Sequence, residues 1–171
     1  MLHSDKQLDA AEEAASRAID LLPEEGDQFR ACQGHRVLGQ IYRSKGNTEK
    51  AIHHFEVALE IASSLNLDSQ LFWVHYGLAH LFSGEGRLDD AHTHIEKARS
   101  YAISDKYNLG RAMEVQAQLW YKQCMFEKAR SGASHAADIY EKFGAARDLA
   151  ECRGFLRRID EELNRPVVSD A

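Results

Sequence analysis

Residues 38–58 read LGQIYRSKGNTEKAIHHFEVA. The chain repeats this pattern as LAHLFSGEGRLDDAHTHIEKA over residues 78–98 and as QAQLWYKQCMFEKARSGASHA over residues 116–136, at intervals of 40 and then 38 residues. Small, aromatic and aliphatic residues recur in the same order in each copy, which indicates a repeat architecture. The first copy carries them at Leu38, Gly39, Tyr42, Gly46, Ala51, Phe55 and Ala58.

Each copy is predicted to be a pair of antiparallel helices. Its apolar residues are three and four positions apart, which places them on one face of an α-helix. The pattern is interrupted once per copy, at Gly46, Gly86 and Cys124. Glycine suits a helix end because it adopts a positive φ without steric penalty. At the third joint we therefore expect Cys124 either to change the turn or to carry strain of about 1 kcal/mol.

The repeats are expected to stack, because one hairpin cannot bury its apolar face alone. We predict an all-α fold with a single array over residues 5–164 and a flexible tail over residues 165–171. Within the array we expect a leading helix over residues 5–22, repeats over residues 27–64, 68–103 and 107–142, and a capping helix over residues 145–164.

The two ends of the array differ. Ala11, Ala15 and Ala18 lie one period before the first copy, so the leading helix reads as a second helix without its partner. Two explanations stay open: the domain belongs to a longer protein, or self-association covers the exposed face. At the other end, Arg153 aligns with Gly39, so no close-packed helix is expected to follow, which is typical of a terminal cap.

The order of residue types in the three copies resembles the tetratricopeptide repeat, over roughly residues 5 to 140. The units are longer than the usual 34 residues, and His35, His75 and Met113 stand where the family commonly has Trp. Long units of this kind are similar to those of kinesin light chains, peptide-sensing bacterial regulators and arrays on signalling ATPases. The resemblance implies a right-handed superhelix in which the first helices line a concave groove.

Composition argues against several partners. The net charge is −6 and the pI is about 5.8, whereas nucleic acids and anionic membranes attract clustered Lys and Arg. No apolar run approaches the roughly 18 residues of a membrane span, and the start lacks a signal-peptide core. Cys32, Cys124 and Cys152 are far apart in the sequence, which favours reduced thiols and a cytoplasmic location.

We predict no catalytic residue, no metal site and no cofactor. SGASH, residues 131–135, lacks the second glycine and the preceding strand of a hydrolase nucleophile motif. None of the nine histidines is three or four residues from another, so we expect them to be partly exposed residues of helix surfaces. Cys32 is expected to be a structural cysteine.

The resemblance places partner-binding residues on the first helix of each repeat. Arg, Trp and Tyr are frequent interface anchors, and guanidinium groups match carboxylates. We therefore expect a protein or peptide partner with an acidic or C-terminal segment, and possible self-association through the N-terminal helix. The alternative is that Trp73 and Tyr76 pack between helices and the arginines pair with nearby carboxylates. The predicted set is Gln33, Arg36, Gln40, Arg43, Trp73, Tyr76, His80, Arg111, Glu114, Gln118 and Tyr121.

Overall fold

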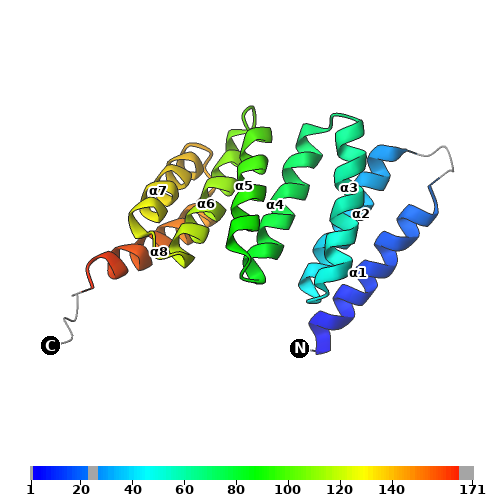
Figure 1. Cartoon of the computed structure of the whole chain (residues 1–171), viewed down its shortest axis with the longest axis horizontal. Coiled ribbons are helices and arrows are strands. Elements are labelled where there is room, and N and C mark those ends of the chain that lie inside the picture. Colours follow the sequence, from blue (N-terminus) through cyan, green and yellow to red (C-terminus); the bar gives the residue numbers. More distant parts are fainter. Residues whose placement is uncertain (1, 23–26, 166–171) are drawn as a thin grey trace. The chain divides into compact units, whose positions relative to one another are not determined.

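The computed structural model describes residues 2–22 and 27–165. Every regular element in these residues is an α-helix (Figure 1). The predicted all-α fold of repeated helix pairs is confirmed. The helices are α1 (Leu2–Asp20), α2 (Gln28–Ser44), α3 (Thr48–Ser64), α4 (Asp68–Gly84), α5 (Leu88–Tyr101), α6 (Lys106–Lys122), α7 (Phe126–Lys142) and α8 (Ala146–Leu163).

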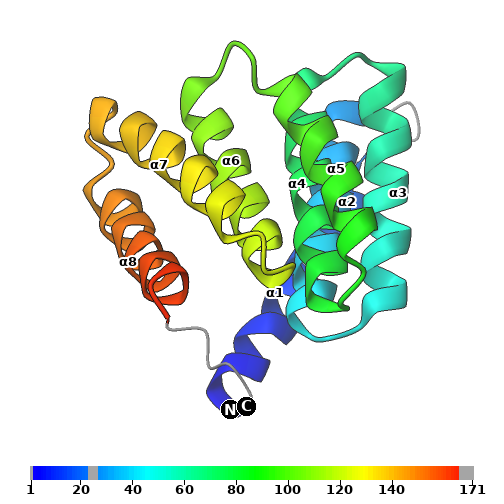
Figure 2. The same ribbon diagram turned by 60° about the vertical axis from the view of Figure 1, so that its left-hand side comes forward.

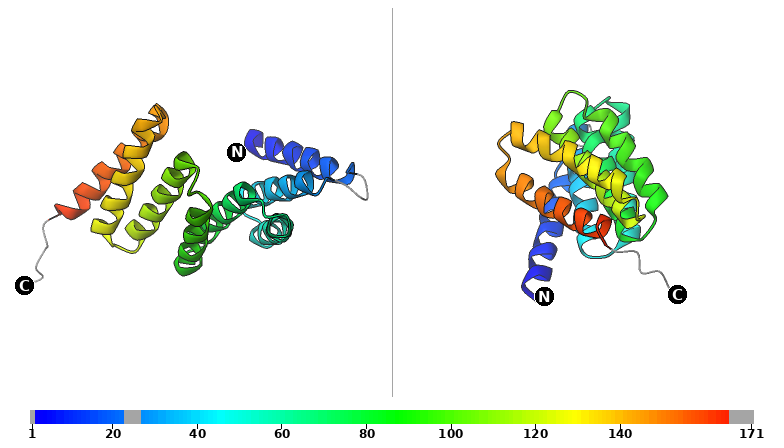
Figure 3. Two further views of the ribbon diagram at one scale, coloured as in Figure 1. Left: turned by 90° about the horizontal axis from the view of Figure 1, so that it is seen from above. Right: turned by 90° about the vertical axis from the view of Figure 1, so that its left-hand side faces the viewer.

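The helices form two compact units, the first ending at Tyr101 and the second beginning at Ala102. In unit 1, α2 pairs with α3 and α4 pairs with α5, while α2 also contacts α1 and α4 (Figure 2). In unit 2, α7 contacts both α6 and α8. Figure 3 shows α1 alongside α2 at one end of unit 1 and α8 alongside α7 in unit 2. The division into one array with the boundaries given above stays a prediction.

The joints within the three hairpins share one backbone conformation. Gly46 and Gly86 have φ of 72° and 75°, as predicted, and Cys124 has φ of 59°. In each joint the next amide closes back on the first helix, as when Met125 N donates to Trp120 O at 2.8 Å. Cys124 therefore keeps the same turn, and of the two outcomes expected for it the strained one applies, because a side chain disfavours this conformation.

The core of unit 1 is organised around Phe55. Its ring is fully buried between α2 and α4, at positions where both helices carry glycine. A Cβ at Gly39 would lie 2.8 Å from the ring, and one at Gly77 would lie 2.7 Å from it. The two glycines thus leave the space that the ring of α3 fills, and this contact joins the first and second hairpins.

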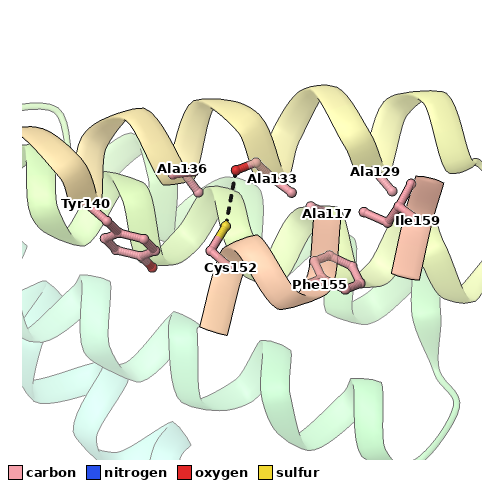
Figure 4. Close-up of a cluster of buried hydrophobic side chains, with 9 residues drawn as sticks. Ala117, Ala129, Ala133, Ala136, Tyr140, Cys152, Phe155 and Ile159 are labelled. Carbon is pink, nitrogen blue, oxygen red and sulfur yellow. Dashed lines mark hydrogen bonds between the residues drawn. The ribbon is translucent and has the colours of Figure 1, made fainter. Parts of the chain in front are cut away.

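The core of unit 2 is built from alanines and the fully buried Tyr140 of α7 (Figure 4). Its alanines lie against Cys152, Phe155 and Ile159 of α8. The Cys152 thiol donates to the backbone carbonyl of Ala133 at 3.2 Å, drawn as the dashed line in Figure 4. These contacts attach the last helix to the third hairpin.

The alignment of α8 differs from the sequence-based expectation by one turn. The first helices begin at Gln28, Asp68 and Lys106, and α8 begins at Ala146. Counted from these starts, Arg157 rather than Arg153 occupies the position of Gly39. A shift of four residues keeps the same helix face, so the apolar spacing alone does not distinguish the two alignments.

Candidate partner-binding surface

The eleven predicted binding residues lie on three first helices and are all half-buried. Gln33, Arg36, Gln40 and Arg43 are on α2, and Trp73, Tyr76 and His80 are on α4. We call these seven residues of unit 1 the α2–α4 face. Arg111, Glu114, Gln118 and Tyr121 are on α6, in unit 2. Their role in binding stays a prediction.

The two arginines of the α2–α4 face are directed toward α4. Arg36 Nε donates to the side-chain oxygen of Gln70 at 3.2 Å, and Arg43 interacts electrostatically with Tyr76. Burial lowers the pKa of both guanidinium groups from its ordinary value. Within residues 2–22 and 27–165 neither of them forms an ion pair with a carboxylate. The alternative of neighbouring acidic partners is thus wrong for these two arginines.

The rings of α4 form a continuous row along the helix. Trp73 is 5.0 Å from Phe72 and 5.7 Å from Tyr76 between ring centroids, and Tyr76 is 4.6 Å from His80. Phe72 is buried, whereas the other three keep part of their surface exposed. The row is therefore held by ring contacts while leaving apolar and polar edges at the surface.

The α6 residues are more engaged in internal contacts. The Tyr140 hydroxyl donates to Glu114 at 2.7 Å, and burial raises the pKa of the Glu114 carboxyl. The Arg111 guanidinium lies 6.0 Å from the centre of the Tyr107 ring. Tyr121 contacts the ring of Phe155 at 5.5 Å. Part of this predicted set thus serves the packing of unit 2.

Two histidine pairs between helices were missed in the sequence. His35 and His54 bring their Nδ1 atoms to 3.0 Å, and His75 and His94 do the same at 3.0 Å. In each neutral pair one Nδ1–H donates and the other Nδ1 accepts. His75 is only 3% exposed, so the expectation of a surface histidine is wrong there. The sequence did carry one indication of these pairs. His75 follows His35 by 40 residues and His94 follows His54 by the same 40 residues, so each repeat has a histidine at both positions.

The histidine pairs resist protonation. Burial, with the neighbouring His94 and Lys97, lowers the pKa of His75 to about 4. Burial likewise lowers the pKa values of His35, His54 and His94. Aromatic rings close each pair: Tyr42 stacks on His54 at 5.3 Å, and Tyr101 stacks on His75 at 5.9 Å. The pairs are thus neutral parts of the hairpin interior near pH 7.

Two of the three cysteines are buried, and all three are free. The Cys32 thiol donates to the Ala58 carbonyl at 3.4 Å, and burial raises its pKa. Burial raises the pKa of Cys152 to about 12. Both therefore act as structural thiols, as expected for Cys32, because the reactive form is the thiolate.

The residues that the structure describes lack two kinds of feature. They contain no helix long and apolar enough to span a membrane. They also contain no group of three or more His, Cys, Asp or Glu side chains arranged to hold a metal ion.

The profile of the tetratricopeptide repeat family matches residues 30–104. Residues 30–104 are tetratricopeptide repeats. This range contains most of α2 and all of α3, α4 and α5, and with them the α2–α4 face and both histidine pairs. Tetratricopeptide repeats generally mediate protein–protein interactions. None of the curated proteins compared with the chain matches it.

Solved structures of tetratricopeptide-like proteins share the fold. BtubC (BKLC) from P. vanneervenii superposes with a TM-score of 0.66 at 17% identity, covering 99% of this chain and 81% of its own. A putative kinesin light chain from Podosopora anserina with nearly identical TPR-like repeats has a TM-score of 0.50 at 15% identity, covering 95% and 92%. A singly substituted form of that light chain has the same TM-score and identity, with 95% and 91% covered. At these identities the likeness concerns the fold alone.

Proposed function

We propose that the chain is a non-catalytic docking module that binds a peptide or protein segment on the α2–α4 face. The observation that carries the proposal is the pair of half-buried guanidinium groups, Arg36 and Arg43, which lack carboxylate partners in the described residues and interact with Gln70 and Tyr76 of α4. A partly desolvated cation is stabilised by a carboxylate from outside. The role of tetratricopeptide repeats in protein–protein interaction supports the same function.

The chemistry of the face favours an acidic ligand. Each guanidinium group has donors beyond those used inside the chain, and a carboxylate accepts two of them side by side. Trp73 and Tyr76 offer apolar area next to this charge, which suits the chain of a bound peptide. We therefore expect an acidic side chain or a free C-terminal carboxylate near Arg36 and Arg43. The α6 residues Arg111 and Gln118 are further contact candidates.

The proposed setting is the cytoplasm. The three cysteines are free thiols, and such thiols persist in a reducing compartment. The chain's acidic balance also favours solution partners over anionic membranes.

A peptide array tests the function. Synthetic acidic peptides, each made with a free and an amidated C-terminus, are bound to the wild-type chain, and fluorescence anisotropy measures Kd for those retained. The double substitution R36Q/R43Q should raise Kd at least about tenfold, since a charged hydrogen bond contributes about 1.5–3 kcal/mol.

The matched control is R17Q/R87Q, which removes two exposed arginines elsewhere in unit 1. Its Kd should equal that of wild type. Unchanged affinity in R36Q/R43Q, or equal losses in both double variants, would contradict binding on the α2–α4 face. A loss on amidation alone identifies a C-terminal ligand.

A further inference from the structure

We propose that copies of this chain associate head to tail, with α8 of one copy packing against α1 of a second copy in the way that a first helix packs against the second helix of its hairpin. This association uses a surface other than the Arg36 and Arg43 region of the α2–α4 face, although Gln33 of that face also lines the depression beside α1. It rests on two open helix surfaces at the ends of the described chain and on their match in register, size and charge.

The open surface of α1 is a row of alanines. α1 corresponds to α3, in which Ala51 and Ala58 are fully buried between two first helices. The matching Ala11 and Ala18 of α1 are exposed, as is Ala14, and Leu21 is 83% exposed. A depression between α1 and α2 is lined by residues including Ala18, Leu21, Gly34 and Val37. It lies where the first helix of a complete hairpin would pack.

The open surface of α8 is the counterpart. α8 corresponds to the first helix of a hairpin and packs on α7 through Cys152, Phe155 and Ile159. Its other side forms a depression lined by Ala146, Leu149, Ala150, Arg153, Leu156 and Arg157. Counted from the helix starts, Ala150, Arg153 and Arg157 occupy the positions of Cys32, His35 and Gly39. In the first hairpin those three residues contact α3.

The sizes of the side chains on the two surfaces are complementary. In the first hairpin, α3 supplies His54 opposite His35 and Phe55 opposite Gly39. The matching residues of α1 are Ala14 and Ala15, whereas those of α8 are the long Arg153 and Arg157. A second helix with Phe at that position would collide with Arg157, but one with alanine leaves room for it. The sequence-based expectation that no close-packed helix follows α8 therefore does not extend to a helix like α1.

The charges are also complementary. Among the described residues that line the α8 depression, the only ionised side chains are those of Arg153 and Arg157. Over residues 6–20, α1 carries four carboxylates, at Asp9, Glu12, Glu13 and Asp20, and only two cations, at Lys6 and Arg17. Some of these charges already pair within one copy: Arg153 with Glu141 at 3.0 Å, Glu13 with Arg17 at 2.8 Å, and Asp9 and Glu12 with Lys45. Arg157 forms no ion pair in the described residues, so its stem can cover the alanines while its guanidinium group reaches the exposed Glu13. A second copy of the chain thus fits where a helix with large or basic side chains would not.

Such an interface is heterologous, because each copy offers α8 to one neighbour and α1 to another. It predicts a specific rule. A variant blocked on either surface is monomeric on its own, whereas a mixture of two differently blocked variants still forms one interface and stops at dimers. A symmetric pairing of two α1 helices obeys a different rule, because α8 then plays no part.

The test uses A14R on α1 and A150R on α8, both at exposed alanines. Sedimentation equilibrium at about 100 µM, where micromolar complexes form, should show self-association of wild type and monomers for each variant alone. An equimolar mixture of A14R and A150R should form dimers and nothing larger, since one intact α8 meets one intact α1. Far-UV circular dichroism checks that each variant is folded.

The matched control is S134R, which places arginine at an exposed small residue of α7 and should associate as wild type does. Monomeric wild type, a monomeric mixture, or an A150R variant that associates normally would each overturn the proposal. Both blocked variants should bind acidic peptides with wild-type Kd, so failure here is distinguishable from failure of the proposed docking function.

Discussion

The hairpins of unit 1 and the third hairpin, in unit 2, fill the interface between their first and second helices with different side chains. His35 and His75 correspond to Met113, and His54 and His94 correspond to Gly132. In unit 2 the space opposite Gly132 is taken by Trp120, whose ring atoms lie 3.1 Å from a Cβ built on that glycine. One backbone arrangement thus accepts either a hydrogen-bonded imidazole pair or an indole over glycine. Only the first of these contains groups that acid can protonate.

The two units also differ in how their second helices fill the interior. Phe55 of α3 occupies the space above Gly39 and Gly77, whereas the matching residue of α7 is Ala133. At this position unit 1 therefore carries one large ring, whereas unit 2 carries a methyl group and buries its rings, Tyr140 and Phe155, elsewhere in the cluster. The chain offers a separate reporter for each unit, because Trp73 lies in α4 and Trp120 in α6.

The largest expected effect is that of F55A. Removing a fully buried ring that joins three helices should lower the free energy of unfolding of unit 1 by about 3–5 kcal/mol. Urea denaturation followed by Trp73 fluorescence in a W120F background measures it. The control F29A removes a ring that is 42% exposed and should change stability by less than about 1 kcal/mol. Equal effects of the two substitutions would contradict the central role of Phe55.

Acid should weaken unit 1 more than unit 2. The pKa of His75 is about 4 in the folded chain, against an ordinary value of 6.5. As pH falls from 6.5 to 4, the unfolded chain takes up a proton that folded His75 does not, so stability present above pH 6.5 is lost. The expected loss is about 3 kcal/mol from this residue.

The matched variant for this prediction is H75M, which introduces the residue that unit 2 has at the same position. Urea denaturation at a series of pH values, read by Trp73 in a W120F background, should give a flatter profile for H75M than for the parent chain. The same series read by Trp120 in a W73F background reports on unit 2. Identical pH profiles for H75M and its parent would show that His75 does not govern the acid sensitivity.

Adding a methyl group at Gly39 or at Gly132 should change the stability of the two units by different amounts. G39A places a Cβ 2.8 Å from the Phe55 ring, which is enclosed on both sides, and should cost about 1–3 kcal/mol. G132A meets Trp120 at 3.1 Å, and its contact cost is offset by the roughly 1 kcal/mol gain in helix propensity. Thermal and urea unfolding should therefore show G39A clearly less stable than G132A, and the reverse order would contradict the packing described.

The smallest effect is expected at the joints. C124G relieves a residue held at φ of 59° and should stabilise unit 2 by up to about 1 kcal/mol, since glycine adopts this conformation without penalty. The reciprocal change G86C should destabilise unit 1 by a similar amount. Urea unfolding midpoints for the two variants, compared with their parent, should therefore move in opposite directions.

Much of the fold was predictable because it depends on local rules. The apolar spacing around Ala51, Ala91 and Ala129 predicts helices with one buried face, and Gly46 and Gly86 mark their joints. The α8 alignment was wrong by one turn because residues four positions apart share a face. For the candidate site, the helices that carry Arg36 and Arg43 were predictable, whereas the hydrogen bond from Tyr140 to Glu114 joins two helices and was not. The role of these residues in binding stays a prediction.

The sequence by itself determined the helices, their pairing into hairpins and the glycine joints, since periodicity and backbone conformation are properties of neighbouring residues. Only the tertiary structure decided that His75 meets His94, that Phe55 lies between two glycines, and that a depression lies beside α1 and another beside α8. The physical reason is that these contacts join different helices. They depend on the register in which the faces of two helices pack together, and the spacing of residues within one helix carries no information about that register.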